Sequence, residues 1–96
     1  MQINLSPVRS NETLTVSRAG DVLTINGELF DFTQLTNGAT LPTAAVGSDH
    51  FVGPVERIDG ELTLTLRLPH GPNPSQAVAF PQPIVVTVDG PVELPR

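Results

Sequence analysis

The residues of this chain best suited to chemistry near neutral pH are its two histidines, His50 and His70. Ser48, Asp49 and His50 include the residue types of a hydrolytic triad. Three neighbours in sequence, however, cannot adopt the geometry in which a serine, a histidine and an acid meet around a substrate. We therefore expect a polar loop that leads into a strand at Phe51, and we predict no catalytic residues.

A metal site would require both histidines to converge with a carboxylate such as Asp49 or Asp31. The strand register derived below places position 50 near position 69, so the two imidazole rings could approach one another. No ligand-spacing motif supports such a site, and the chain has no cysteine. We expect no bound metal and no other cofactor.

The remaining candidates for chemistry are better explained by structure. Glycine-rich phosphate loops are absent. Asp31 lies between two phenylalanines, but alternation along a strand places it on the wetter face of its sheet. Arg57 shares the apolar side of its hairpin, where we expect it to lie over that surface or to pair across an interface. These observations predict that the protein is not an enzyme.

The charge of the chain excludes several classes of partner. Five arginines, no lysine and ten acidic residues give a net charge of −5. The arginines are scattered, whereas nucleic-acid binding needs a basic face. No apolar run approaches the ~20 residues that cross a bilayer, and the first residues lack the features of a signal peptide. We expect no nucleic-acid partner, no membrane partner and a cytoplasmic location.

Two similar phrases, INGEL at residues 25–29 and IDGEL at residues 58–62, predict the elements that hold these residues in place. Asn-Gly and Asp-Gly tolerate the positive φ angles that a type I′ turn requires at both central residues, so each phrase indicates a tight β-hairpin. The predicted turn residues are Asn26, Gly27, Asp59 and Gly60.

The first of these turns fixes which residues of its hairpin share a face. Strands at 22–26 and 28–33 then pair Ile25 with Glu28 and Leu23 with Phe30. The predicted core face contains Leu23, Ile25, Phe30 and Phe32. The other face, which mixes Val22 and Leu29 with Thr24 and Asp31, should be half wet.

The second turn places four leucines in one stripe at a period of two residues, the strongest strand signal in the chain. These are Leu62, Leu64, Leu66 and Leu68. Continued pairing would set Gly53 opposite Leu66 and Phe51 opposite Leu68. Gly53 and Pro54 indicate a bulge or bend, so pairing is less secure beyond Val55.

The rest of the chain predicts further strands and one helical turn. Residues 2–8 suit an edge strand because of Pro7. Residues 12–17 alternate as a strand, followed by a four-residue loop at 18–21. Residues 84–88 are apolar on nearly both faces and suit a central strand. Pro42 and Gly47 bracket one helical turn.

Together these elements predict an all-β fold. We expect a small antiparallel sandwich or open barrel of six or seven strands, with two tight hairpins and one short helical turn. Residues 1–96 should form a single domain in which residues 91–96 are an extended C-terminal tail, because Pro91 cannot donate the amide that closes a third hairpin.

The long connection at residues 69–83, which holds five prolines, is the candidate interaction loop. Connections of this length are uncommon and often functional, although a simple crossover between sheet layers is the alternative. The core is thin, with four phenylalanines and no tryptophan or tyrosine, which favours a homo-oligomer. The candidate contact residues are Pro69, His70, Gly71, Pro72, Asn73, Pro74 and Phe80.

Residues 51–71 (FVGPVERIDGELTLTLRLPHG) resemble part of small bacteriophage and prophage proteins of Gram-negative hosts, and residues 3–9 and 20–27 are similar too. Those proteins carry no established activity, so no functional residue is transferred. The resemblance implies a non-enzymatic structural or assembly protein from the tail or late structural gene region. It would contact other phage structural proteins or itself, in the bacterial host cytoplasm or incorporated in the virion. The alternative is a small acidic binding module that inhibits a host protein.

Overall fold

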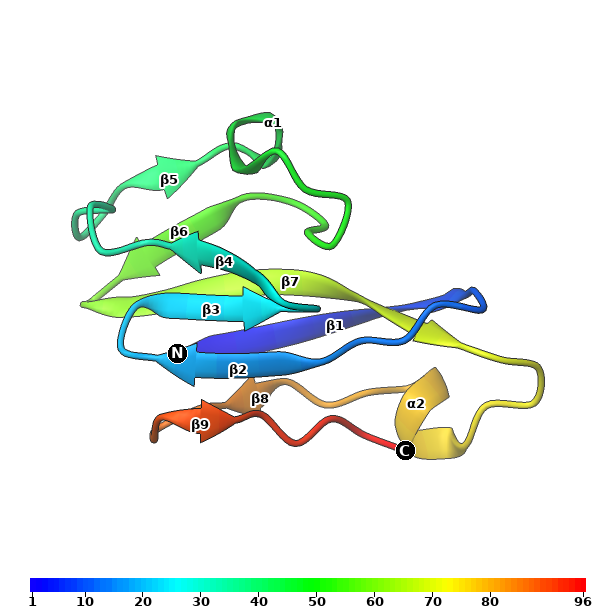
Figure 1. Cartoon of the computed structure of the whole chain (residues 1–96). Helices are drawn as coiled ribbons and strands as arrows, with labels where there is room; N and C mark the ends of the chain where they lie inside the picture. Colours follow the sequence, from blue (N-terminus) through cyan, green and yellow to red (C-terminus); the bar gives the residue numbers. More distant parts are fainter.

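The computed structural model describes all residues, 1–96, and contains nine strands and two helices of four residues each (Figure 1). In chain order the elements are β1 (Gln2–Arg9), β2 (Val16–Ala19), β3 (Val22–Ile25), β4 (Glu28–Asp31), β5 (Thr40–Leu41), α1 (Thr43–Val46), β6 (Val55–Ile58), β7 (Glu61–His70), α2 (Gln76–Ala79), β8 (Ile84–Val85) and β9 (Gly90–Pro91).

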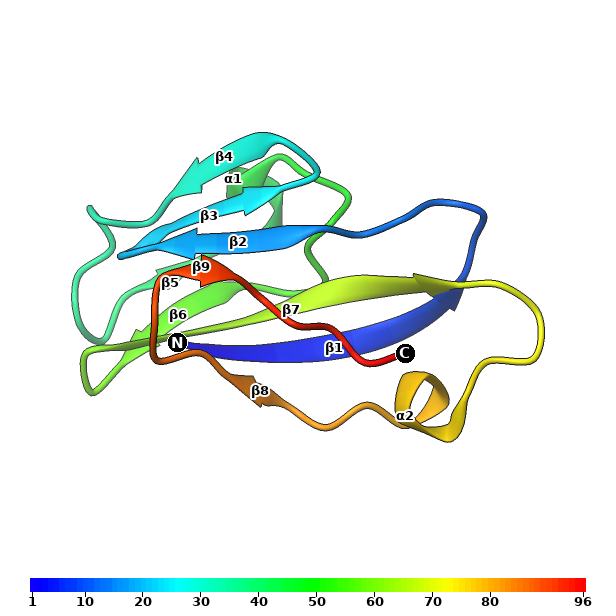
Figure 2. The same cartoon turned by 60° about the horizontal axis from the view of Figure 1, so that its bottom comes forward.

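The strands form two sheets that lie one above the other (Figure 2). The large sheet has the order β5-β6-β7-β1-β8, and the small sheet has the order β4-β3-β2-β9. The predicted all-β sandwich is confirmed, and the sheets do not close into a barrel. Three of the nine strands, β5, β8 and β9, have only two residues each. The other six are the longer strands of the sandwich. The single predicted helical turn is matched by α1, and α2 is a second one.

β1 departs from the predicted antiparallel edge strand, because it lies inside the large sheet and runs parallel to β7. Its other neighbour, β8, pairs only with Gln2 and Ile3. Pro7 therefore lies in a stretch of β1 that has a strand on one side only, where a missing amide donor leaves no ladder bond unmade. The proline correctly indicated an open edge there, but the strand as a whole is interior.

The β3–β4 hairpin has the predicted turn and register. Asn26 and Gly27 have φ angles of 51° and 84°, as a type I′ turn requires. Leu23 pairs with Phe30 and Ile25 with Glu28, and the four predicted core residues of this hairpin are buried. The opposite face is half wet, as expected: Leu29 is 70% exposed.

The β6–β7 hairpin follows its predicted register as far as β6 extends. Asp59 and Gly60 have φ angles of 50° and 81°, and Ile58 pairs with Glu61. All four leucines of the stripe are buried. Before β6 the pairing shifts, since Phe51 bridges to Leu66, and the predicted Gly53–Leu66 and Phe51–Leu68 pairs were wrong. The cause is the expected bend at Gly53, where φ is 87°.

The β2–β3 hairpin is tighter than predicted. The strand starts at Val16 and not at residue 12, and Ala19 pairs with Val22, which leaves a two-residue loop in place of four. Gly20 has a φ of 61°, whereas Asp21 has no positive φ, the combination of a type II′ turn. The segment before β2 is held by the Asn26 side chain, which accepts a hydrogen bond from the Thr15 amide and donates one to the Thr13 carbonyl.

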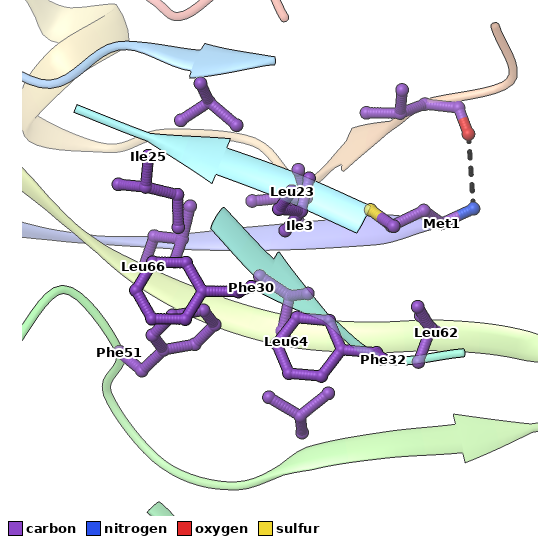
Figure 3. Packing of buried hydrophobic residues seen from close by; sticks show 13 residues of the cluster. Met1, Ile3, Leu23, Ile25, Phe30, Phe32, Phe51, Leu62, Leu64 and Leu66 are labelled. Carbon is purple, nitrogen blue, oxygen red and sulfur yellow. Dashed lines mark hydrogen bonds between the residues drawn. The ribbon is translucent and has the colours of Figure 1, made fainter. Parts of the chain in front are cut away.

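The core lies between the sheets and draws on both (Figure 3). The Phe51 ring stands edge-on to Phe30 at 5.1 Å and to Phe32 at 5.9 Å between ring centroids. Such pairs add about 0.5–1.5 kcal/mol each beyond the burial of their area. At the other end of the core Met1 is buried, and its amino group donates a hydrogen bond to the Val86 carbonyl at 3.1 Å.

The C-terminal segment differs most from expectation. Residues 84–88 do not form a central strand: β8 is a two-residue strand at the edge of the large sheet. As predicted, the C-terminal tail forms no hairpin with β8. Part of the tail nevertheless forms a strand. Gly90 and Pro91 form β9 on the edge of β2, and the Val92 amide donates to the Val16 carbonyl at 2.8 Å. The connection after β7 returns to the same sheet beyond β1, so it is not a crossover between layers.

Every free sheet edge carries a feature that opposes pairing with another chain. Pro42 follows β5, Pro83 precedes β8, and Pro91 lies within β9. The fourth edge strand, β4, begins at Glu28 and ends at Asp31, so it is charged at both ends. These edges therefore favour contact with other molecules through side chains and disfavour the addition of a strand.

Candidate interaction surface

The predicted interaction loop is divided between a strand, a bend and a helix. Pro69 and His70 belong to β7, where they pair with Val8 and Arg9 of β1, so the connection itself begins at Gly71. The His70 Nδ1 donates to the adjacent Gly71 carbonyl at 2.7 Å. This local bond turns the ring toward its own backbone.

The bend that follows lies on the surface. Gly71, Pro72, Asn73 and Pro74 are exposed, and Asn73 has a φ of 58°. Helix α2 then begins after Ser75, whose hydroxyl accepts a hydrogen bond from the Val78 amide at 3.3 Å. This helix was missed at the level of sequence, although a serine cap before a run without proline is a helix-start signal.

Phe80 is the predicted contact residue with the clearest surface role. Its side chain follows α2 and is 74% exposed, the most exposed large apolar side chain of the chain. It borders an open groove of about 440 Å³. The groove lies between the end of α2, β8 and the C-terminal segment, which run along one side of the molecule (Figure 2). Its lining residues are Ala77, Phe80, Gln82, Pro83, Ile84, Val85, Glu93 and Pro95.

Sequence reasoning missed the β8 residues of this groove. Val85 was assigned to a buried central strand, yet it is 63% exposed on the edge strand. The sequence carries no signal for this exposure, since no aspartate, glutamate, lysine or arginine occurs from residue 68 to residue 88, a composition that favours burial. We call the groove and its lining residues the Phe80 surface.

The candidates for chemistry fall elsewhere and do not assemble. Ser48, Asp49 and His50 line a polar hollow of about 330 Å³, together with Glu12, Glu28 and Arg67. Ser48 Oγ accepts a hydrogen bond from the His50 backbone amide at 3.2 Å, and no hydrogen bond between two side chains joins these three residues. His70 lines a different hollow from His50. No group of three or more histidine or acidic side chains is placed to hold a metal ion.

Asp31 lies on the wet face, as alternation predicted, and it is a local cap. Its carboxylate accepts one hydrogen bond from the Thr33 hydroxyl and another from the Thr33 amide. These bonds stabilise the charged form, so they lower the pKa of Asp31 below its ordinary value of 3.8. A carboxyl group of lowered pKa stays ionised at neutral pH and is unsuited to general acid catalysis.

The predicted turn residues and Arg57 serve the fold. Arg57 donates to the carbonyls of Leu35, Phe32 and Gly60 and forms an ion pair with Asp21. The Gly60 amide donates to the Asn37 side chain at 2.9 Å, which ties the second turn to the loop before β5. Among the predicted contact residues, Phe80 is the large apolar side chain that stays exposed.

Comparison with known proteins adds no constraint on this surface: no protein-family model, curated protein or solved structure matches the chain. Neither helix has the length or the apolar character needed to cross a membrane.

Proposed function

We propose that this protein is a non-enzymatic structural or assembly protein of a bacteriophage, associated with the tail, which acts through protein–protein contacts. One observation carries the proposal: Phe80, the most exposed large apolar side chain, lies in a stretch of chain without aspartate, glutamate, lysine or arginine (68–88) and borders a groove in which Glu93 is the only charged residue. Exposed apolar surface of this kind marks contact sites on soluble proteins. The phage setting is supported by the resemblance of residues 51–71 described above.

The proposed contact uses side chains and not the sheet edge. Pro83 lies directly before β8 and has no amide hydrogen to donate to an added strand. Pro81 lies two residues earlier. A partner would therefore cover the ring of Phe80 and the neighbouring aliphatic groups without adding a strand.

The test is removal and restoration of the gene in a phage or prophage that carries it. We expect infectious particles to be lost on deletion and restored by the wild-type gene. Phe80→Ser should not restore them, whereas Leu29→Ser should, because Leu29 is 70% exposed on the other sheet. The protein should also be detected in purified particles or in their assembly intermediates. Undiminished infectivity after deletion would rule the proposal out.

A second candidate function is inhibition of a host protein by an acidic surface. It is favoured by the polar hollow at His50, which brings together Glu12, Glu28 and Asp49 in a chain of net charge −5. Under this alternative the deleted phage still forms infectious particles. Charge reversal at Glu12 and Glu28, and not Phe80→Ser, would then abolish the effect on the host.

A further inference from the structure

Residues 87–96 form a strap that leaves the large sheet after β8 and crosses to the small sheet at β9 (Figure 2). The strap begins after Val86, which is buried. The Val86 carbonyl accepts hydrogen bonds from the Met1 amino group and from Arg18 Nη1, both at 3.1 Å, and the Val86 amide donates to the Met1 carbonyl at 2.8 Å. Three hydrogen bonds therefore hold the point from which the strap starts.

Beyond this point the strap has few bonds to the rest of the chain. Asp89 provides the only side-chain hydrogen bond of residues 87–96, since its Oδ1 accepts from the Gly20 amide at 2.9 Å. β9 pairs only two residues with β2, and the Val92 amide adds one further bond to that strand. No backbone hydrogen bond involves residues 93–96. The last part of the strap is thus held by side-chain packing alone.

That packing is incomplete, because two hollows border the strap. Val92 and Leu94 are half-buried against the core. One hollow, of about 490 Å³, lies between the strap, the segment before β2 and the end of β7, and the other is the groove of the Phe80 surface. Glu93 and Pro95 line both hollows. A segment opens locally when few apolar contacts and hydrogen bonds offset the entropy of ordering its backbone.

We propose that residues 87–96 open and close as a unit, with Val86 fixed and both sheets folded, and that this motion regulates the Phe80 surface. Opening removes Glu93 and Pro95, which form one wall of that groove, and uncovers the edge of β2. The inference deepens the proposed function, because it gives the same surface a means of regulation, and its value for contact rests on that function. The opening itself is a property of the purified chain.

Native-state hydrogen exchange on the full chain tests the opening. The Val86 and Val92 amides each donate a backbone hydrogen bond of 2.8 Å, one before the strap and one within it. We expect the protection factor of Val92 to be about tenfold or more below that of Val86. Asp89→Ala removes the bond to Gly20, so it should lower the protection of Val92 further and leave that of Val86 unchanged. Asp59→Ala is the matched control, since Asp59 is also an exposed acid before a glycine, and it should change neither.

A disulfide bond provides the complementary test, because the chain has no cysteine of its own. Ser17 of β2 pairs with Pro91 of β9. The next pair along these strands is bonded through the Val92 amide, so positions 17 and 91 form the non-hydrogen-bonded kind of pair, in which side chains lie closest. In a variant with both Ser17→Cys and Pro91→Cys, oxidation should raise the protection of Val92 to the level of Val86, and reduction should reverse the change.

Equal protection of Val86 and Val92 in the wild-type chain would overturn the inference. So would an oxidised double variant in which Val92 exchanges as fast as in the reduced form. A strap that stays closed would leave the proposed contact at Phe80 standing. Undiminished infectivity after gene deletion would contradict the proposed function and leave the opening of the strap unaffected.

Discussion

Arg57 of β6 forms an ion pair with Asp21 of the β2–β3 turn, with 3.1 Å between Nη2 and Oδ2, and so joins the two sheets. The same guanidinium group donates to the carbonyl oxygens of Leu35 at 2.6 Å, Phe32 at 3.1 Å and Gly60 at 3.2 Å. The Arg57 side chain is 12% exposed and that of Asp21 is 36% exposed. The Arg57 side chain therefore binds both the loop after β4 and the turn after β6.

Replacement of Arg57 by methionine should lower the free energy of unfolding by about 1–3 kcal/mol, because it leaves the partly buried carbonyl group of Leu35 without a donor. Asp21→Asn should cost only about 0–1 kcal/mol, since ion pairs that reach solvent contribute little. Urea unfolding of the two variants measures both values. Equal costs would mean that the ion pair, and not the carbonyl contacts, holds this end of the sandwich.

The two type I′ turns offer a matched pair for a second prediction. Asn26 and Asp59 have φ angles of 51° and 50°, but only Asn26 uses its side chain, to hold Thr13 and Thr15. Asn26→Gly keeps the turn and removes the three hydrogen bonds of the Asn26 side chain, so it should cost about 1–2 kcal/mol. Asp59→Gly should change stability by less than about 0.5 kcal/mol. Chemical denaturation compares them, and similar costs would show that turn conformation alone matters at both sites.

A third prediction concerns the pH dependence of stability at Asp31. The Thr33 hydroxyl lowers the pKa of Asp31 in the folded state, so it stabilises the fold above the ordinary pKa of 3.8. That contribution disappears as the pH falls through the lowered value. Thr33→Val removes the hydroxyl but keeps the amide, so the pKa should rise toward its ordinary value without reaching it. Carboxyl NMR titration measures the shift, and an unchanged pKa would assign the effect to the Thr33 amide.

The sequence predicted the two hairpins well because both turns and core faces depend on local chemistry. Asn-Gly and Asp-Gly select one turn type, that turn fixes the register, and the register puts Leu23 and Phe30 on the buried face. Arg57 was also expected to serve the structure. What the pattern could not supply was its set of acceptors, since Leu35 and Phe32 reach it only after the chain has crossed between sheets.

The errors concern features that depend on distant parts of the chain. The parallel pairing of β1 with β7 joins residues about sixty positions apart, and no local signal encodes it. The pattern of residues 84–88 predicts a central strand, because these residues are apolar on nearly both faces. Their burial is limited by what lies beside them: β1 offers only Gln2 and Ile3 for pairing, so Val85 and Val88 remain exposed. Of the candidate contact surface, Phe80 was found from sequence and the β8 half was not.

A final prediction concerns Pro83, which opposes strand pairing at the free edge of β8. The Val86 amide donates to the Met1 carbonyl at 2.8 Å, so alternate amides along this segment point away from β1, and position 83 is one of them. Pro83→Thr restores an outward donor beside Val85 and should promote strand addition between chains. We expect thioflavin-positive aggregates at concentrations where the wild-type protein stays dispersed. Pro72→Thr, in the exposed bend, controls for the entropy of the unfolded chain. If both variants behave like the wild type, proline at position 83 is not what keeps this edge unpaired.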